Sequence, residues 1–374
     1  MTSKVAHYSI AGVSGDKPKG KPPMNPRPSS SIILLSPTNQ VLLVHRVKTS
    51  SAFASAHVFP GGNLSEFHDG AVPPPDDPAR HQDGRPYRLG AVRETFEETG
   101  VLLARGADGG LLSLPAAERD AARKRIYANE ISFEEWLKSV GGEPDLENLH
   151  PFTRWITPPA TPKRFTTQMY LYMLPLSGLE STSHATSDIT AAASQAEAVL
   201  PTPDGTEITT SVFEDASTWL ARQKRGEVIL FPPQAFLLTL VSQHCTEPAP
   251  TGSSETAAAQ HYEAQRRGLL EFLYKTPTAT HPKALKQATS QISWADKVIS
   301  PVTALVLPDG RAVLSLERPG PELKGTGRGG DWERVVLVRF AKGTATEVEV
   351  RDREEVFAEQ RHTERSEKEK EAKL

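Results

Sequence analysis

The segment that most constrains this chain is Arg93-Glu94-Thr95-Phe96-Glu97-Glu98-Thr99-Gly100-Val101. If it is helical, Glu94, Glu97 and Glu98 lie three or four positions apart and share one face. Like charges at this spacing destabilise an isolated helix by about 0.2–0.5 kcal/mol per pair, and the usual compensation is a cation between them. Because all the ligands are oxygen, they favour Mg²⁺ or Mn²⁺ over zinc. The segment therefore predicts a helix that carries a divalent metal site.

Arg93 precedes Glu97 by four positions and is expected to hold that carboxylate in one orientation. Gly100 is expected to end the helix, with Val101-Leu102-Leu103 returning to a buried strand. Taken alone, the Arg-Glu-x-x-Glu-Glu pattern favours a solvated helix with surface salt bridges. Upstream, however, Phe59-Pro60-Gly61-Gly62 indicates a strand end and a tight glycine turn, where backbone amides can approach a phosphate closely. That context favours the metal site.

Composition and charge exclude several classes of partner. The 43 Lys and Arg against 46 Asp and Glu give a formal charge of −3, without the basic excess that attraction to nucleic acid or anionic lipid requires. No stretch approaches the roughly 20 apolar residues of a membrane-spanning helix, and the first residues lack the apolar run of a signal peptide. The single cysteine, Cys245, is expected to be a core residue. We expect a soluble intracellular protein with no nucleic-acid or membrane partner.

The last three residues, Ala372-Lys373-Leu374, are a close variant of the C-terminal Ser-Lys-Leu address that the peroxisomal import receptor reads. Glu and Lys alternate from Glu364 to Lys373, which predicts a solvated tail that leaves the address accessible. The sequence therefore predicts a peroxisomal location through the import receptor, and a cytoplasmic one otherwise.

Together, Phe59–Gly62 and Arg93–Val101 resemble the Nudix box, whose family pattern is G-x5-E-x7-R-E-U-x-E-E-x-G-U. The second half matches nearly residue for residue, with Thr95 where a bulky aliphatic residue is usual. The resemblance implies an α/β (α+β) fold: a Nudix α-β-α sandwich with a mixed sheet, inserted helices and an additional C-terminal antiparallel β region.

The spacing departs from the family pattern. Gly62 precedes Arg93 by 31 positions, whereas the pattern has 14, so the box carries an insertion of about 17 residues. The early glutamate of the pattern would fall at Arg85. Its substitute stays open among four acidic residues, Glu66, Asp69, Asp76 and Asp77. Because the glutamate triplet is intact, we interpret the insertion as a loop.

Five segments divide the chain of 374 residues, which is long for one compact domain. The prediction is a flexible N-terminal arm (1–29), a Nudix hydrolase domain (30–245) with the insertion at about 63–90, a linker and helical segment (246–290), a small antiparallel β region (291–352) and a charged tail (353–374). Within them, the patterns predict a hairpin over 31–46, amphipathic helices in 115–140, strands at 152–156 and 168–176, and a hairpin turn at 307–310.

Further segments resemble the branch of the family associated with peroxisomal coenzyme A diphosphatases. They are Leu42-Leu43-Val44-His45-Arg46, Ser55 to Gly62, Trp155-Ile156-Thr157-Pro158 with Arg164-Phe165-Thr166-Thr167, and Phe231-Pro232-Pro233-Gln234. The coenzyme A signature of Nudix enzymes is met only in part. Leu42, Leu43, Arg46 and Phe59 to Gly62 agree with it, whereas Ser51 and Ser55 replace its second arginine and its glycine.

The resemblance implies attack of water on one phosphorus of a P–O–P bridge, assisted by Mg²⁺ or Mn²⁺. Glu94 and Glu98 are the first choices as direct ligands. Glu97, oriented by Arg93, would either bind a second ion or orient the nucleophilic water, so this pair is assigned to catalysis and Glu97 also to the metal site.

Four residues are candidates for binding the substrate phosphates: Arg46, Gly61, Gly62 and Arg164. A guanidinium can contact a phosphate with two N–H groups, although either arginine could instead be an ordinary ion-pair partner. The expected substrate is a small-molecule diphosphate, coenzyme A or acyl-CoA, cleaved to a 4′-phosphopantetheine product and adenosine 3′,5′-bisphosphate. The alternatives are another nucleoside diphosphate or a prenyl diphosphate as substrate, or a non-catalytic nucleotide-binding module.

Overall fold

The computed structural model describes residues 24–47, 55–176, 208–341 and 344–371. Its centre is an eight-stranded mixed sheet with the path β10-β7-β8-β1-β2-β3, in which β4 also pairs with β1, and β9 with β2. The pairs β1·β8 and β10·β7 are parallel and the others antiparallel. The strands are β1 (Arg27–Leu35), β2 (Val41–Arg46), β3 (His57–Val58), β4 (Gly61–Asn63), β7 (His150–Ile156), β8 (Phe165–Met173), β9 (Ile208–Glu214) and β10 (Val298–Ile299).

A second sheet of four antiparallel strands lies C-terminal to the first. Its order is β11 (Val302–Val306), β12 (Ala312–Leu316), β13 (Asp331–Ala341) and β14 (Thr344–Asp352). The predicted hairpin turn joins β11 to β12, where the amide of Gly310 donates to the carbonyl of Leu307 at 2.8 Å. A two-stranded sheet is formed by β5 (Ala104–Arg105) and β6 (Glu143–Pro144).

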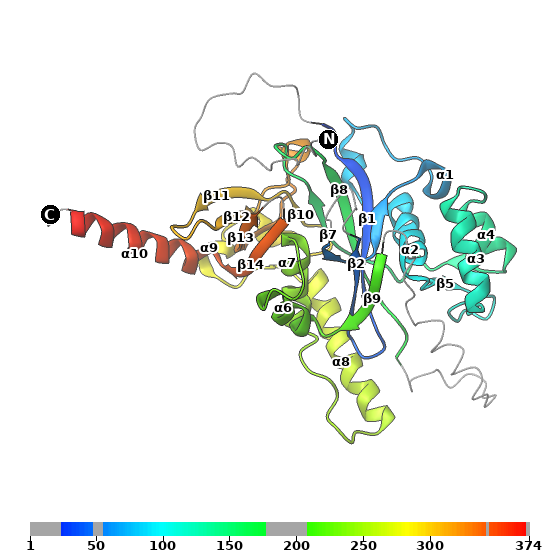
Figure 1. The fold of residues 1–374 in the computed structure, drawn as a ribbon. Helices are drawn as coiled ribbons and strands as arrows, with labels where there is room; N and C mark the ends of the chain where they lie inside the picture. The colour runs from blue at the N-terminus through cyan, green and yellow to red at the C-terminus, as the bar shows by residue number, and fades with distance from the viewer. Residues whose placement is uncertain (1–23, 48–54, 177–207, 342–343, 372–374) are drawn as a thin grey trace, which may run out of the picture.

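Helices cover both faces of the main sheet. In Figure 1 the layers run from the second sheet through α6 and α7, then the main sheet, to α2, α3 and α4. The helices are α1 (Glu66–Asp69), α2 (Arg85–Thr99), α3 (Ala116–Tyr127), α4 (Phe133–Ser139), α6 (Ala216–Lys224), α7 (Pro232–Ser242), α8 (Glu255–Tyr274), α9 (Pro282–Leu285) and α10 (Arg353–Glu371), with 3-10 turns at Pro78–His81 (η1), Ala288–Gln291 (η2) and Pro321–Leu323 (η3). The predicted α+β architecture is confirmed.

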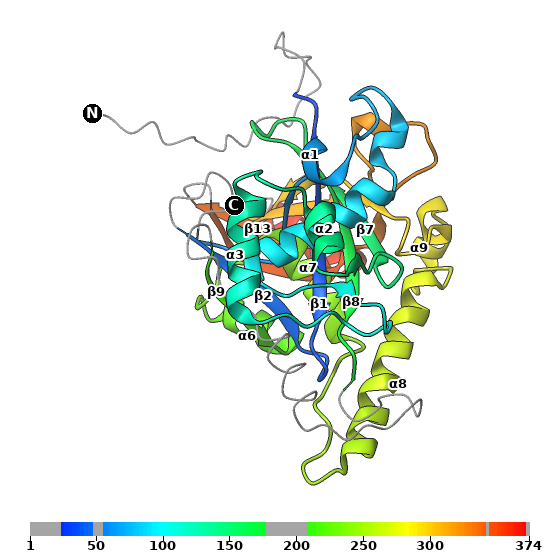
Figure 2. The ribbon, with the colours of Figure 1, turned by 90° about the vertical axis from the view of Figure 1, so that its right-hand side faces the viewer.

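The main sheet is covered on both faces because side chains alternate between the two faces along β1. Ile32 and Leu34 belong to a buried cluster with residues of α2, α3 and α4, whereas Ile33 and Leu35 belong to one with residues of α6, α7, α8 and the second sheet. Successive side chains of a strand point to opposite faces, so a continuously apolar strand must be covered on both. Figure 2 shows α2 lying in front of β1 and β8. Among the described helices, none is long and apolar enough to cross a membrane.

Helix α2 is longer than the sequence pattern indicated, because it begins at Arg85 rather than Arg93. Pro86 stands in its first turn, where the missing amide hydrogen costs no helical bond. Its end is as predicted: Gly100 adopts a left-handed φ of 71° and its amide closes on the carbonyl of Phe96. Residues 101–103 are buried but form no strand, which corrects the prediction for that segment; pairing starts at β5.

The two predicted tails also need correction. The expected flexible arm of residues 1–29 includes Arg27, at which β1 already begins, while residues 1–23 lie outside the described residues. Most of the expected charged tail is helical: it forms α10, which projects from the second sheet (Figure 1). Glu, Lys, Arg and Gln are good helix formers, and Val356 anchors the helix by packing with Val313 and Val335. The C-terminal residues 372–374 lie outside the described part of the chain.

Candidate active site

A glycine turn and the C-terminal half of α2 meet at the edge of β1. Gly61 pairs with Ser31 and Gly62 with Ser30 in an antiparallel register. A Cβ atom on Gly61, which has a φ of +152°, would stand 2.3 Å from the carbonyl oxygen of Ser30, a distance that no side chain tolerates. The close approach of β4 to β1 therefore depends on glycine. It places the turn beside the acidic face of α2.

This arrangement encloses a cavity of about 200 Å³, which we call the carboxylate pocket. Its lining consists of Arg46, Gly61, Gly62, Asn63, Glu94, Glu97, Glu98 and Tyr127. The structure thus brings together the three predicted glutamates, both glycines and one of the two predicted substrate arginines. Asn63 and Tyr127 were not singled out from the sequence. Asn63 directly follows the glycine pair, but nothing in the sequence connects Tyr127, at the end of α3, with this pocket.

The three glutamates differ in what holds them. Glu98 accepts a hydrogen bond from the backbone amide of Gly61 at 3.0 Å and pairs with Nη1 of Arg46 at 3.4 Å. Glu94 and Glu97 both contact Nη1 of Arg93, at 3.0 and 2.9 Å. The orientation of Glu97 by Arg93 that the helical spacing predicts is therefore present in the structure.

The electrostatics of the pocket reflect crowded carboxylates. Burial raises the pKa of Glu94 to about 7; Arg93 opposes this shift, while the like charges of Glu97 and Asp69 add to it. Burial by itself lowers the pKa of Arg93, but the surrounding carboxylates of Glu94, Asp69 and Glu97 outweigh it and hold that pKa well above its usual value. The pocket thus concentrates negative charge with little access to water, an environment that favours a bound cation.

The donor chemistry of the pocket fits a hard divalent cation, because three of its lining side chains are carboxylates. The carboxylates themselves are turned toward Arg93 and Arg46. Within the described segments of the chain, no group of three or more His, Cys, Asp or Glu side chains is arranged to hold a metal ion. A cation that enters the pocket would therefore have to draw Glu94 or Glu98 away from its guanidinium partner.

Arg164, predicted to bind substrate, is not brought to this pocket. Its side chain is buried and pairs with Glu322 at 2.6 Å. It also donates to the carbonyl oxygens of Thr157 and Met24, both at 2.9 Å. The pair with Glu322 joins the start of β8 to η3 in the C-terminal region. The structure corrects the prediction because this guanidinium is committed to the interior.

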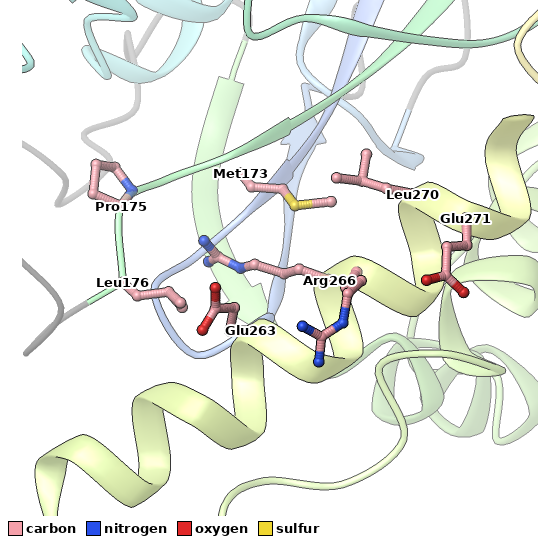
Figure 3. Close-up of a pocket in the computed structure, with 8 residues that line it drawn as sticks. Met173, Pro175, Leu176, Glu263, Arg266, Leu270 and Glu271 are labelled. Carbon is pink, nitrogen blue, oxygen red and sulfur yellow. The ribbon is translucent and has the colours of Figure 1, made fainter.

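A larger cavity, of about 520 Å³, lies between the end of β8 and α8 (Figure 3). Apolar side chains such as Met173 and Leu270 form much of its wall. Arg266, also on the wall, donates to Asn39 Oδ1 and to the carbonyl oxygens of Leu174 and Ser36 at 2.7–2.8 Å, so it fastens α8 to the main sheet. The acidic face of α2 and the glycine turn do not line this cavity.

Parts of the chain are similar to a known family model and to a solved structure. The family model described as the NUDT19 Nudix domain matches residues 81–239, which include the whole of α2. A crystal structure of a NUDIX hydrolase from Alicyclobacillus acidocaldarius is 23% identical, with a TM-score of 0.42; the match covers 57% of this chain and 90% of that one.

Two curated relatives share sequence with the chain. The acyl-coenzyme A diphosphatase NUDT19 of Gallus gallus is 28% identical over 247 residues, which cover 53% of this chain and 60% of that protein. The putative nudix hydrolase 7 of Caenorhabditis elegans is 30% identical over 156 residues, which cover 41% of this chain and 47% of that protein. The chain therefore spans less than two thirds of either relative's length. The matched segment, residues 81–239, is similar to a Nudix domain, and the chain resembles the coenzyme A diphosphatase branch of the Nudix hydrolases.

Proposed function

We propose that this protein hydrolyses the diphosphate linkage of coenzyme A or an acyl-CoA with Mg²⁺ or Mn²⁺, giving a 4′-phosphopantetheine product and adenosine 3′,5′-bisphosphate. The proposed reaction class is supported by the carboxylate pocket, in which three glutamates of one helix face a glycine turn. The substrate class rests on the chicken relative, which is named as an acyl-coenzyme A diphosphatase.

In the proposed mechanism, Glu94 and Glu98 would hold the divalent metal ion that Nudix hydrolases generally use. Such an ion, when bound, neutralises charge on the diphosphate and on the leaving phosphate. Glu97 orients the attacking water, and Arg93 fixes Glu97 through the 2.9 Å contact of Nη1 with its carboxylate. Each step uses a carboxylate whose position α2 sets.

The remaining groups of the pocket suit a phosphate. Arg46, which pairs with Glu98, reaches the wall of the pocket from β2, and its guanidinium carries N–H donors of the kind that bind a phosphate oxygen. Gly61 and Gly62 line the pocket with backbone, against which the carboxylates of Glu98 and Glu94 lie in the structure, so a phosphate that binds the turn competes with these carboxylates for it. We propose that these three residues bind the substrate phosphates.

A panel of diphosphates incubated with the full chain and Mg²⁺ tests this proposal. It should contain coenzyme A, an acyl-CoA, a sugar nucleotide, a dinucleotide and a prenyl diphosphate. Preferential release of adenosine 3′,5′-bisphosphate from the coenzyme A compounds supports the proposal. Preference for another diphosphate would keep the reaction class and replace the substrate. A lack of turnover of every compound would leave only the nucleotide-binding alternative.

A substitution in the pocket serves as the internal control. Glu98→Gln removes the charge of a proposed ligand while keeping its shape, so turnover should be lost without unfolding. Glu118→Gln makes the same change at an exposed position in the first turn of α3 and should retain wild-type turnover. Full activity of a folded Glu98→Gln variant would remove Glu98 from the ligand set.

We also propose that Ala372-Lys373-Leu374 directs the protein to peroxisomes through the import receptor. Expression with an N-terminal fluorescent tag tests the address. A chain ending at Leu374 should appear in peroxisomes, and one ending at Lys373 should stay in the cytosol. Identical distributions of the two chains would reject the address.

A further inference from the structure

Tyr127, the last residue of α3, lies on the wall of the carboxylate pocket and has no part in the proposed chemistry. The other described residues of the lining are charged, polar or glycine, whereas Tyr127 contributes an aromatic ring. It is also open to solvent, because 59% of the residue is exposed. Aromatic side chains bury a large area when they are covered, so this ring is a candidate contact for a ligand that enters the pocket.

The position of this ring is fixed from the side of α2. Arg123 lies one turn before Tyr127, and residues four apart in a helix share a face. Its Nε and Nη2 donate to the carbonyl oxygen of Glu97, at 3.0 and 2.7 Å. Ile126, next to Tyr127, is fully buried in a cluster that includes Phe96 of α2. Helix α3 is thus attached to the helix that carries the glutamates.

A second contact fixes the chain just after α3. Asn129 adopts a left-handed φ of 55°, and its Oδ1 lies 2.9 Å from Nε2 of His68, in α1. Nδ1 of the same histidine accepts from the amide of Phe133 at 3.2 Å, so Nε2 carries the hydrogen and donates to Asn129. The backbone at Tyr127 is therefore held on both sides. A ring on a fixed backbone loses little freedom when a ligand covers it.

Exposure alone does not distinguish Tyr127 from other surface aromatic residues. Tyr274, at the end of α8, is 51% exposed, and Phe67, in α1, is 53% exposed. Neither residue lines the carboxylate pocket. At Tyr127 three features coincide: an exposed ring, a backbone held on both sides, and a place on the wall of the proposed diphosphate site.

The proposed substrate carries one planar aromatic group, the adenine base, which a ribose joins to the diphosphate. The charged groups of the pocket suit phosphates and a metal ion, whereas a tyrosine ring suits a base, because the face of any base can stack on an aromatic side chain. We propose that the adenine base of the substrate stacks on Tyr127, which makes this tyrosine a specificity-determining residue. The inference rests on the proposed function and names the part of the substrate that α3 recognises.

Calorimetric titration of the full chain with adenosine 3′,5′-bisphosphate tests the inference without turnover, because this nucleotide has no diphosphate linkage. Tyr127→Leu should weaken its binding by about tenfold, in the range found for base stacking on aromatic side chains. Tyr127→Phe keeps the ring and should bind the nucleotide within about twofold of wild type. Binding of 4′-phosphopantetheine, which has no base, should change by less than about twofold in Tyr127→Leu.

Steady-state kinetics with coenzyme A give a second measurement. Tyr127→Leu should raise KM by about tenfold and leave kcat within about twofold, because stacking contributes equally to the bound substrate and to the transition state. Tyr274→Leu is the matched control. It removes a similarly exposed tyrosine that lies outside the carboxylate pocket, so KM and kcat should equal those of wild type.

A folded Tyr127→Leu variant with wild-type affinity for adenosine 3′,5′-bisphosphate would overturn the inference. Equal losses of affinity for the nucleotide and for 4′-phosphopantetheine would also overturn it, as would a wild-type chain that does not bind the nucleotide. If Tyr127→Leu does not fold, Tyr127→Gln replaces it with the same expected results. Failure of the proposed function is recognised separately: the wild-type chain then binds the nucleotide, and Tyr127→Leu weakens that binding, without hydrolysis of coenzyme A or an acyl-CoA.

Discussion

The carboxylate of Glu94 lies directly against Gly62. A Cβ atom added to Gly62 would stand 2.4 Å from Oε2 and 2.5 Å from Cδ of Glu94. Position 62 has no left-handed φ, so the backbone conformation alone does not require glycine there. The requirement comes from the neighbour: a proposed metal ligand occupies the space that any side chain would need.

The first prediction follows from this contact. Gly62→Ala should displace the Glu94 carboxylate, because the alternative is movement of β4 away from α2. A displacement of about 1 Å at a reacting centre can cost about 100-fold in rate, so kcat should fall by that order. The stability should fall by about 1–3 kcal/mol, as in other overpacked sites. Steady-state kinetics and urea unfolding measure the two effects.

Gly268→Ala is the matched control for that substitution. Gly268 lies inside α8, and the nearest atom to its added Cβ is His244 Nδ1 at 3.8 Å, an ordinary contact. Alanine in a helix interior is more favourable than glycine by about 0.5–1 kcal/mol, so this variant should be more stable and equally active. A comparable loss of activity in both variants would mean that the Gly62 contact has no special role.

The second prediction concerns the buried pair of Arg164 and Glu322. Glu322→Gln leaves a guanidinium that is 1% exposed without its counter-charge, which should cost about 3 kcal/mol in urea unfolding. KM for the diphosphate should not change, because the pair lies outside the carboxylate pocket. Glu349→Gln is the control: its pair with Arg311 is exposed and should contribute less than about 1 kcal/mol. A raised KM in Glu322→Gln would restore Arg164 as a substrate ligand.

The parts of this site that could be predicted from sequence depend on local geometry. Helical spacing alone puts Glu94, Glu97 and Glu98 on one face, and the left-handed conformation of Gly100 ends the helix wherever the rest of the chain lies. The pairing of Asp69 with Arg93 could not be predicted in this way. It depends on how α1 folds back over α2, and four acidic residues of the insertion were equally eligible.

The position of Arg164 could not be predicted from its local sequence. It stands beside a strand with a family-like motif, and nothing near it in sequence indicates Glu322, its partner in the C-terminal region.

Helix α10 could not be predicted for a different reason. Its charged residues are compatible with both a solvated tail and a helix, and burial of Val356 against the second sheet, a contact between distant segments, favours the helix.

The third prediction is a pH dependence of stability that comes from His81. Burial, followed by the charge of Arg154, lowers the pKa of this histidine from 6.5 to about 4, and its Nδ1 lies 2.9 Å from the hydroxyl of Thr166. Between these pH values the unfolded chain binds the extra proton and the folded chain does not, so stability falls as the pH is lowered. From pH 6.5 to about 4.5 the free energy of unfolding, measured in urea, should fall by about 2 kcal/mol.

His81→Asn tests this prediction because it removes the titrating ring, so the pH dependence of stability should weaken by that amount. His362→Asn, on the exposed surface of α10, is the control and should leave the pH dependence unchanged. Equal pH dependence in wild type and His81→Asn would mean that the pKa of this ring is not lowered by folding.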